Sequence, residues 1–179
     1  NPFTRYEFLY SLESSGCTTE ETGWKPYHVL VTEGDTEREN FDRPIAVMPL
    51  YLKSNSWGEY VFDWSWAESY ARHGINYYPK LVTSIPFTPS VGSRIMMQVD
   101  IDRVTIAQLI YEAIQLKAET LGVSSWHVLF PKEEEHELLC SIGTQSRVAT
   151  QFHWFNNGYA NFSDFLASLN ARKRKAIKK

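Results

Sequence analysis

Four ionisable residues stand in apolar surroundings and are the first candidates for chemistry. Asp63 and His153 are each flanked by two aromatic residues, Lys80 occurs in the segment YYPKL, and Arg94 opens the segment RIMMQV. A charged group in such surroundings is costly unless it is paired or used by the protein. Carboxylate and imidazole groups can accept protons, and Lys and Arg can bind anions. The four residues therefore predict a site for a polar or charged ligand.

Three of these residues also have a purely structural interpretation. Asp63 could cap a helix that begins near Trp66. Lys80 could be a solvated strand residue, and His153 could be a satisfied core or edge histidine. Their position beside a stretch rich in aromatic residues favours the functional interpretation.

The stretch from Trp57 to Phe87 holds nine of the 26 aromatic residues of the chain. A core built only for stability would use more Leu, Ile and Val, which need no partner for an O–H or N–H group. The stretch is therefore either an aromatic core layer or the wall of a ligand pocket, and we interpret it as a wall. The predicted wall residues are Trp64, Trp66, Tyr77, Tyr78 and Phe87.

Several other chemistries leave no signature in the sequence. It has no GxxxxGK[ST] phosphate loop, no GxGxxG dinucleotide turn and no GxSxG nucleophile elbow. The five histidines lack the spacing of metal ligands, so we expect no metal site. Cys17 and Cys140 predict free thiols in a reducing compartment. No apolar run reaches the roughly 20 residues of a membrane helix, and we expect a cytoplasmic protein.

The charge of the chain is unevenly distributed. The net charge is −3, but the last eight residues, RKRKAIKK, hold six of the 18 basic residues. The remaining 12 basic residues face 21 acidic ones, so the body is acidic and the end is basic. An acidic body argues against a nucleic-acid groove across the whole domain and leaves the basic end as the candidate contact.

Hydrophobic spacing predicts an alternating order of helices and strands. Helices are expected over 4–16, 66–74, Val104–Leu121, 131–143 and 161–179, the last with Ser163 as its N-cap. Strands are expected over 26–34, 43–55, 78–88, 93–99, 124–130 and 147–156, with the charged loop DTERENFD joining the first two. This order predicts an α/β (α+β) fold with one mixed sheet of about six or seven strands and helices on both faces.

Five segments carry a family resemblance: GEYVFDWSWA, YYPKL, PFTP, HVLFP and QFHWFNNGYANFSDFLASLNARKRKAIKK. On these segments, and over essentially its whole length, the chain resembles the FemAB-like family of peptidoglycan-biosynthesis proteins in the GNAT acyltransferase superfamily. The resemblance implies a GNAT-like acyltransferase fold. Since full-length Fem-type ligases resemble two GNAT domains in tandem, it predicts a GNAT-like domain over 1–160. Residues 161–179 would then be a basic helix leading towards a missing second domain.

The resemblance also implies a reaction. Fem-type relatives transfer an aminoacyl group from aminoacyl-tRNA to an amine of a peptidoglycan precursor, whereas other GNAT enzymes use acyl-CoA. The segment RIMMQVDIDRVTIAQL stands where those enzymes carry a glycine-containing phosphate loop, and it has no glycine. Aminoacyl-tRNA or an unknown donor is therefore favoured, acyl-CoA would bind in the missing half, and this half is expected to shape the acceptor site.

Amine acylation needs a base and a binding site for the acceptor. The resemblance makes Asp63 or His153 the base and lets Lys80 and Arg94 bind anionic groups of the acceptor. Arg172, Lys173, Arg174 and Lys175 would contact a polyanion such as tRNA, or the second domain. The alternative is a non-catalytic, degenerate GNAT module that binds a cell-wall precursor or a partner protein.

Overall fold

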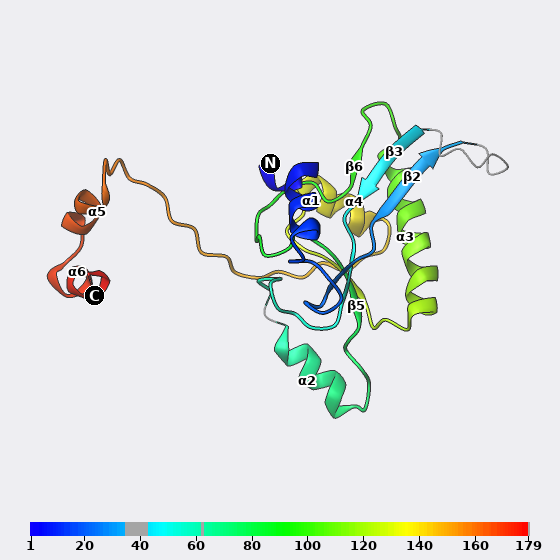
Figure 1. The fold of residues 1–179 in the computed structure, drawn as a ribbon, viewed down its shortest axis with the longest axis horizontal. Helices are drawn as coiled ribbons and strands as arrows, with labels where there is room; N and C mark the ends of the chain where they lie inside the picture. The colour runs from blue at the N-terminus through cyan, green and yellow to red at the C-terminus, as the bar shows by residue number, and fades with distance from the viewer. Residues whose placement is uncertain (35–42, 62, 179) are drawn as a thin grey trace. The chain divides into compact units, whose positions relative to one another are not determined.

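The computed structural model describes residues 1–34, 43–61 and 63–178. The predicted charged loop 35–42 and Phe62 lie outside these residues. The chain forms two compact units, unit 1 (Asn1–Arg147) and unit 2 (Val148–Lys179), and each is described by itself (Figure 1).

Unit 1 is a mixed α/β unit. Its helices are η1 (Pro2–Thr4), α1 (Tyr6–Ser14), α2 (Trp64–Arg72), α3 (Arg103–Leu121) and α4 (Glu133–Ser141). Its strands are β1 (Trp24–Pro26), β2 (Val29–Glu33), β3 (Arg43–Met48), β4 (Tyr51–Lys53), β5 (Lys80–Thr83), β6 (Met96–Met97) and β7 (Trp126–Val128). The mixed α/β class is confirmed, and the architecture is consistent with a GNAT-type fold.

The strands form two sheets, so the prediction of one continuous sheet is wrong. The first sheet has the order β1-β4-β5-β7, with antiparallel pairs except for the parallel pair β5–β7. The second has the order β2-β3-β6 and is antiparallel. The described strands number seven, as the sequence suggests, but they are shared between the two sheets.

The strands separate into two sheets where two predicted strands are interrupted at positions that lie opposite each other. The predicted strand 26–34 breaks between β1 and β2, and the predicted strand 43–55 breaks between β3 and β4 at Pro49 and Leu50. The Tyr27 N–H donates to the Leu50 carbonyl at 2.7 Å, and the Leu50 N–H donates to Nδ1 of His28 at 3.1 Å. Proline has no N–H to continue a ladder. The segment between β1 and β2 and the segment between β3 and β4 therefore pass from one sheet to the other side by side.

Helix α3 supplies the largest helical part of the core. Ile106, Ile110 and Ile114 are buried, as their spacing predicts, and they share one cluster with Met48 of β3 and Leu81 of β5. Gly122 ends the helix with a φ of 63°. In Figure 1, α2 lies at the end of unit 1 away from the β2–β3 hairpin. This arrangement leaves α2 free to border a surface site.

Unit 2 differs from the prediction in two ways. Residues 144–157 contain no strand, so the predicted strand over 147–156 is wrong: its alternating side chains are exposed, with Phe152 at 94%. The predicted single helix is two helices, α5 (Phe162–Ser168) and α6 (Ala171–Ile177). The side chains of Asn161 and Asn170 cap them, which corrects Ser163 as the predicted N-cap.

Gly58 is expected to tolerate a side chain poorly. Its φ is +79°, and an added Cβ would lie 2.5 Å from Cδ1 of Phe87. Gly58→Ala should lower the free energy of unfolding by about 2 kcal/mol or more, because left-handed strain and overpacking add. Gly122→Ala is the matched control, since its φ is +63° and nothing lies within 4 Å of the added Cβ. Strain alone predicts about 1 kcal/mol there. Equal losses in urea denaturation would contradict the close approach of Phe87.

Candidate functional site

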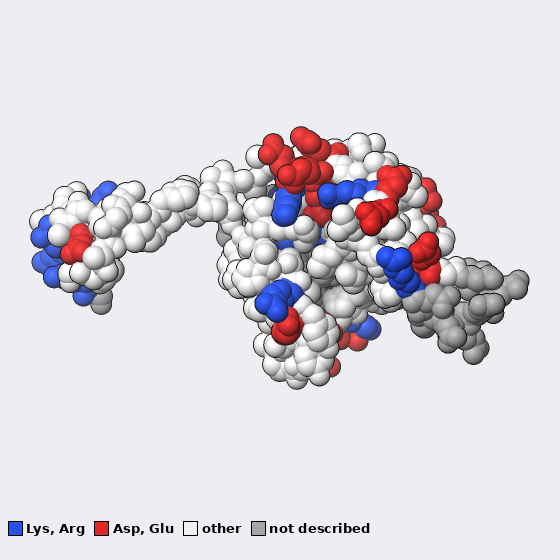
Figure 2. All heavy atoms as spheres, turned by 90° about the horizontal axis from the view of Figure 1, so that it is seen from above, with Lys and Arg blue, Asp and Glu red and all other residues white. Residues whose placement is uncertain are grey.

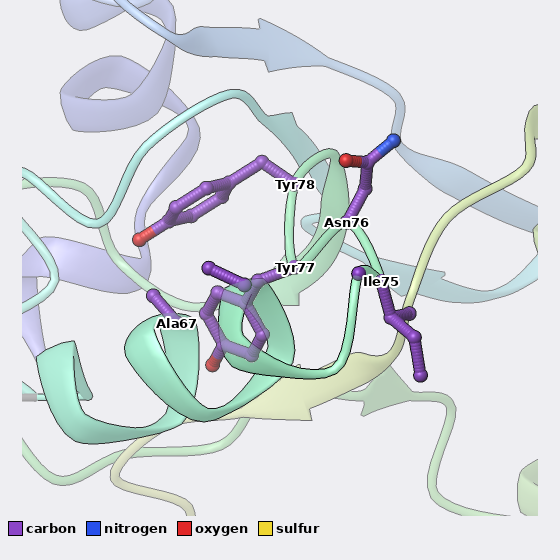
Figure 3. A pocket seen from close by; sticks show the side chains of 7 residues that line it. Ala67, Ile75, Asn76, Tyr77 and Tyr78 are labelled. Atoms are coloured by element: carbon purple, nitrogen blue, oxygen red, sulfur yellow. The ribbon is translucent and has the colours of Figure 1, made fainter.

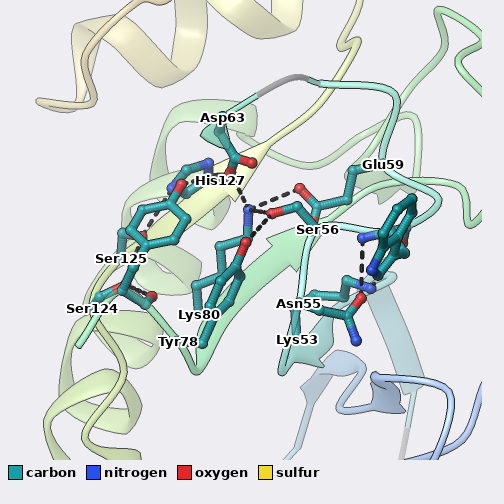
Figure 4. A network of polar contacts seen from close by, with 12 residues as sticks. Lys53, Asn55, Ser56, Glu59, Asp63, Tyr78, Lys80, Ser124, Ser125 and His127 are labelled. Carbon is teal, nitrogen blue, oxygen red and sulfur yellow. Dashed lines mark hydrogen bonds and ion pairs between the residues drawn. The ribbon is translucent and has the colours of Figure 1, made fainter. Parts of the chain in front are cut away.

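A buried lysine with two acidic partners forms the centre of the candidate site. Lys80 is the first residue of β5, and its side chain is fully buried. Its Nζ donates to Oδ2 of Asp63 at 2.6 Å, to Oε2 of Glu59 at 2.8 Å and to Oγ of Ser56 at 3.0 Å (Figure 4). The interpretation of Lys80 as a solvated strand residue is therefore wrong. We call Lys80, Ser56, Glu59, Asp63 and Tyr77 the Lys80 cluster.

Asp63 has the position of a helix cap but a different bonding pattern. It is the N-cap residue of α2, yet its side chain makes no hydrogen bond to the helix. Its Oδ2 instead accepts from Lys80 and, at 2.6 Å, from the hydroxyl of Tyr77. The carboxylate thus joins the start of α2, the segment before β5 and the first residue of β5.

The surroundings move the pKa values of the cluster in opposite directions. Burial raises the pKa of Glu59 and outweighs the opposing effect of Lys80. For Asp63, burial is the largest single influence and acts upward, but the hydrogen bonds from Lys80 and Tyr77 and the charge of Lys80 together lower the pKa. Burial and the hydrogen bond to Asp63 raise the pKa of Tyr77 well above its ordinary value. Asp63 is therefore the firmly ionised partner of Lys80, and Tyr77 stays protonated.

Two further basic side chains adjoin the cluster, the buried Lys53 and the half-buried His127. Burial lowers the pKa of Lys53 to about 7, Glu59 opposes this and Lys80 adds to it. The Nζ of Lys53 lies 3.6 Å from the ring centroid of Trp24 and donates to the Trp57 carbonyl. Burial, followed by the charge of Lys80, lowers the pKa of His127 to about 4, so this imidazole is neutral at pH 7.

An open cavity of about 470 Å³ lies on the other side of the tyrosines. It is lined by Ala67, Ala71, Gly74, Ile75, Asn76, Tyr77 and Tyr78. Figure 3 shows the hydroxyls of Tyr77 and Tyr78 pointing away from the side chains of Ile75 and Asn76. These hydroxyls bond to Asp63 at 2.6 Å and to Oγ of Ser56 at 2.7 Å, respectively. The cluster therefore fixes from behind two rings that face the cavity.

The predicted wall is only partly assembled. Tyr77 and Tyr78 line the cavity, but Trp64, Trp66 and Phe87 line neither of the two cavities described in unit 1. Trp64 packs on Trp57 at 5.4 Å, and Phe87 packs on Trp24 at 5.5 Å, measured between ring centroids. The indole of Trp66 lies under Arg147. The aromatic stretch therefore divides between the cavity, the core and the surface.

Neither Arg94 nor Lys80 lines either of the two cavities described in unit 1. Arg94 is buried, and its guanidinium donates to the carbonyls of Leu129, Gly92 and Ser90 at 2.7, 3.2 and 2.6 Å. Burial, opposed by the charge of Glu135, lowers its pKa to about 10. These bonds tie the loop before β6 to the segment after β7 and give Arg94 a structural role, while its contact with a ligand stays a prediction.

The remaining predicted residues lie in unit 2. His153 is exposed, with Nε2 at 3.0 Å from Oε1 of Gln151 and its ring stacked on Phe155. Arg172, Lys173 and Lys175 are exposed as well. Arg174 differs because its guanidinium donates to the Leu166 and Leu169 carbonyls at the end of α5. Figure 2 shows Lys and Arg gathered on unit 2 and both signs of charge on unit 1.

The turn before α3 is a poor phosphate site. Asp102 caps the helix: its Oδ1 accepts from the Val104 N–H and its Oδ2 from the Thr105 hydroxyl. These bonds lower the pKa of Asp102, so a carboxylate occupies the helix end that would attract a phosphate.

Sequence reasoning missed Ser56, Glu59, Lys53 and His127. One signal was present: Glu59 and Asp63 are two acids within an otherwise uncharged aromatic segment. The described residues hold no group of three or more metal-binding side chains, and none of their helices is long and apolar enough to span a membrane.

The family comparison agrees with the fold and with the sequence segments. A FemAB-like family model, described as peptidoglycan biosynthesis/recognition, matches residues 1–179. The chain belongs to the FemAB-like family. No curated protein and no solved structure matches this FemAB-like chain. Membership places it among proteins of peptidoglycan biosynthesis or recognition, and the Lys80 cluster and its cavity are the local features to explain.

Proposed function

We propose that this FemAB-like chain forms the acceptor side of a Fem-type N-acyltransferase that transfers an aminoacyl group to an amine of a peptidoglycan precursor. The observation that carries the proposal is the cavity beside α2, whose two tyrosines are anchored from behind by the Lys80 cluster. A binding site needs walls that are fixed before the ligand arrives. The buried ion pair of Lys80 and Asp63 has three direct hydrogen-bond partners, Ser56, Glu59 and Tyr77, and it supplies such fixation.

In this reaction the cavity wall has to position the acceptor and does not have to supply a nucleophile. A neutral amine attacks an ester carbonyl directly, so no covalent intermediate on the protein is required. Asp63 is occupied by Lys80 and Tyr77, which makes it a positioning residue in this proposal. His153 is exposed and remains the proposed base, which would convert the acceptor ammonium into the neutral amine that attacks.

The donor in this proposal is aminoacyl-tRNA. Asp102 closes the helix end where an acyl-CoA pyrophosphate would bind. The exposed Arg172, Lys173 and Lys175 offer phosphate contacts, while Arg174 holds α5 and α6 together. A second GNAT-like domain after the basic segment and a cytoplasmic location are parts of the same proposal.

A non-catalytic module is the second candidate. Two observations favour it. Asp63 is paired with Lys80 and so does not act as a base, and Asp102 caps the end of α3 where a donor phosphate would bind. Such a module would bind the precursor in the same cavity and would transfer nothing. Transfer and binding must therefore be measured separately.

The test fills the cavity without touching the cluster. Ala71→Trp places a ring in the cavity from α2, and Ala113→Trp on the exposed side of α3 is the matched control. With full-length protein, aminoacyl-tRNA carrying a labelled amino acid, and a soluble muramyl pentapeptide with a side-chain amine, Ala71→Trp should raise the acceptor KM at least tenfold. The donor KM should not change. Equal acceptor KM values in both variants would refute the acceptor site, and binding without transfer would favour the non-catalytic module.

A further inference from the structure

A second cavity adjoins the first across a single side chain. It measures about 360 Å³ and is lined by Glu20, Lys25, Leu52, Ser54, Tyr78 and Pro79. Tyr78 lines both cavities, and its hydroxyl is held by Ser56, which also accepts from Lys80. The ring of Tyr78 is therefore a fixed divider over which one extended ligand could pass.

The two cavities differ in charge. The first is lined by small, aromatic and amide side chains, and none of the described residues in its lining is charged. The second contains the ion pair of Lys25 and Glu20, with Nζ at 2.9 Å from Oε2. The side chain of Lys25 is 42% exposed and that of Glu20 is 72% exposed. Lys25 is thus the better held of the two, and Glu20 can turn away into solvent.

We propose that the acceptor spans both cavities, with its amine-bearing portion in the first and a carboxylate bound by Lys25 in the second. This inference rests on the proposed function and names the acceptor as an extended, carboxylate-bearing peptide. The ligand carboxylate replaces Glu20 as the partner of Lys25, so the charge of the cavity stays balanced. A doubly charged phosphate fits less well, because Lys25 is the one cation among the described residues of this lining and Glu20 lies beside it.

A ligand carboxylate can replace Glu20 beside Lys25 at little energetic cost, because the Lys25–Glu20 ion pair is weak. Exposed pairs of this kind contribute little, since water competes for both charges. A carboxylate delivered by a ligand already held in the first cavity arrives at a high effective concentration. Lys25 would therefore act on specificity, by selecting acceptors whose carboxylate lies at the right distance from the amine.

Calorimetric titration of the full-length protein tests this proposal without requiring turnover. The probes are the muramyl pentapeptide and the same molecule with its C-terminal carboxylate converted to an amide. The unmodified protein should bind the acid about tenfold more tightly than the amide. Lys25→Gln should abolish that preference, Lys117→Gln on α3 should keep it, and Glu20→Gln should strengthen binding of the acid by removing its competitor.

Three outcomes would overturn the inference. Equal affinities for acid and amide show that no carboxylate is read. A preference that survives in Lys25→Gln assigns the contact to another cation. Unchanged acid affinity in Ala71→Trp shows that the ligand does not span both cavities. The proposed function fails separately, because a protein that prefers the acid through Lys25 yet transfers no aminoacyl group retains the binding site without the reaction.

Discussion

Lys80→Met is expected to lower the free energy of unfolding by about 3–5 kcal/mol, because it leaves two buried carboxylates without their cation. Nζ of Lys80 donates to both Glu59 and Asp63, and the side chains of all three are at most 1% exposed. Each acid already has one buried oxygen without a hydrogen-bond partner among the described residues, Oε1 of Glu59 and Oδ1 of Asp63. Removing Lys80 adds to that deficit and lets the two charges repel each other. Urea denaturation at pH 7 measures the loss.

The control is a lysine in an exposed ion pair. Lys25→Met breaks the pair with Glu20, where exposure of both charges to water should keep the loss far smaller than in Lys80→Met. The pH dependence separates the charge effect from packing. The native pKa of Asp63 is lowered in the unmodified protein, so its stabilisation is present above the unfolded pKa and is lost as pH falls through the native pKa.

In Lys80→Met the unpaired carboxylates should have raised native pKa values, so their cost is full above those native pKa values and disappears as the pH falls below the unfolded pKa. The difference between the two proteins should therefore shrink as the pH falls from 7 to 4. Adding Glu59→Gln and Asp63→Asn to Lys80→Met should recover part of the stability at pH 7. A loss that is constant with pH would assign Lys80 a packing role instead.

The sequence predicted the elements of unit 1 better than their assembly. The helical spacing of Ile106, Ile110 and Ile114 is local, and the structure confirms it. Where the chain passes between the two sheets, the Tyr27 N–H donates to the Leu50 carbonyl, and no hydrophobic pattern encodes such a pairing. The predicted strand over 147–156 has the same limit. Alternation indicates extended backbone, but a strand also needs a neighbour to pair with.

The candidate site was predictable as a set of residue types but not as contacts. Asp63 and Lys80 are candidates from sequence because charges are rare in an aromatic stretch. In the structure, Nζ of Lys80 lies 2.6 Å from Oδ2 of Asp63. Arg94 satisfied the same criterion, yet its partners are backbone carbonyls. Aromatic residues close in sequence were assigned to one wall, whereas Phe87 packs on Trp24 and Tyr77 bonds to Asp63. Sequence proximity cannot tell which side of the chain each ring faces.

A third buried acid, Glu135, makes a specific contact that the acidic pattern of a helix start does not reveal. Glu133, Glu134 and Glu135 open α4, where the helix dipole favours negative charge. Glu135 does more, because it is 2% exposed and accepts hydrogen bonds from the N–H groups of Arg94 and Ile95 at 2.7–3.0 Å. Burial raises its pKa, opposed by these bonds and by the charge of Arg94. The carboxylate therefore completes two buried backbone groups and balances one buried cation.

Glu135→Ala is expected to lower the free energy of unfolding by about 3 kcal/mol or more. Two buried N–H groups lose their acceptor, each at a cost of about 1–3 kcal/mol, and the Arg94 guanidinium loses its nearby negative charge. Glu134→Ala is the matched control, since Glu134 is exposed in the same first turn and loses only its dipole interaction, about 0.3–1 kcal/mol. Hydrogen exchange should locate the loss: the Arg94 and Ile95 amides should exchange faster in Glu135→Ala and unchanged in Glu134→Ala. Equal protection of these two amides from exchange in both variants would mean that β6 and the residues just before it are held by the Arg94 side chain rather than by Glu135.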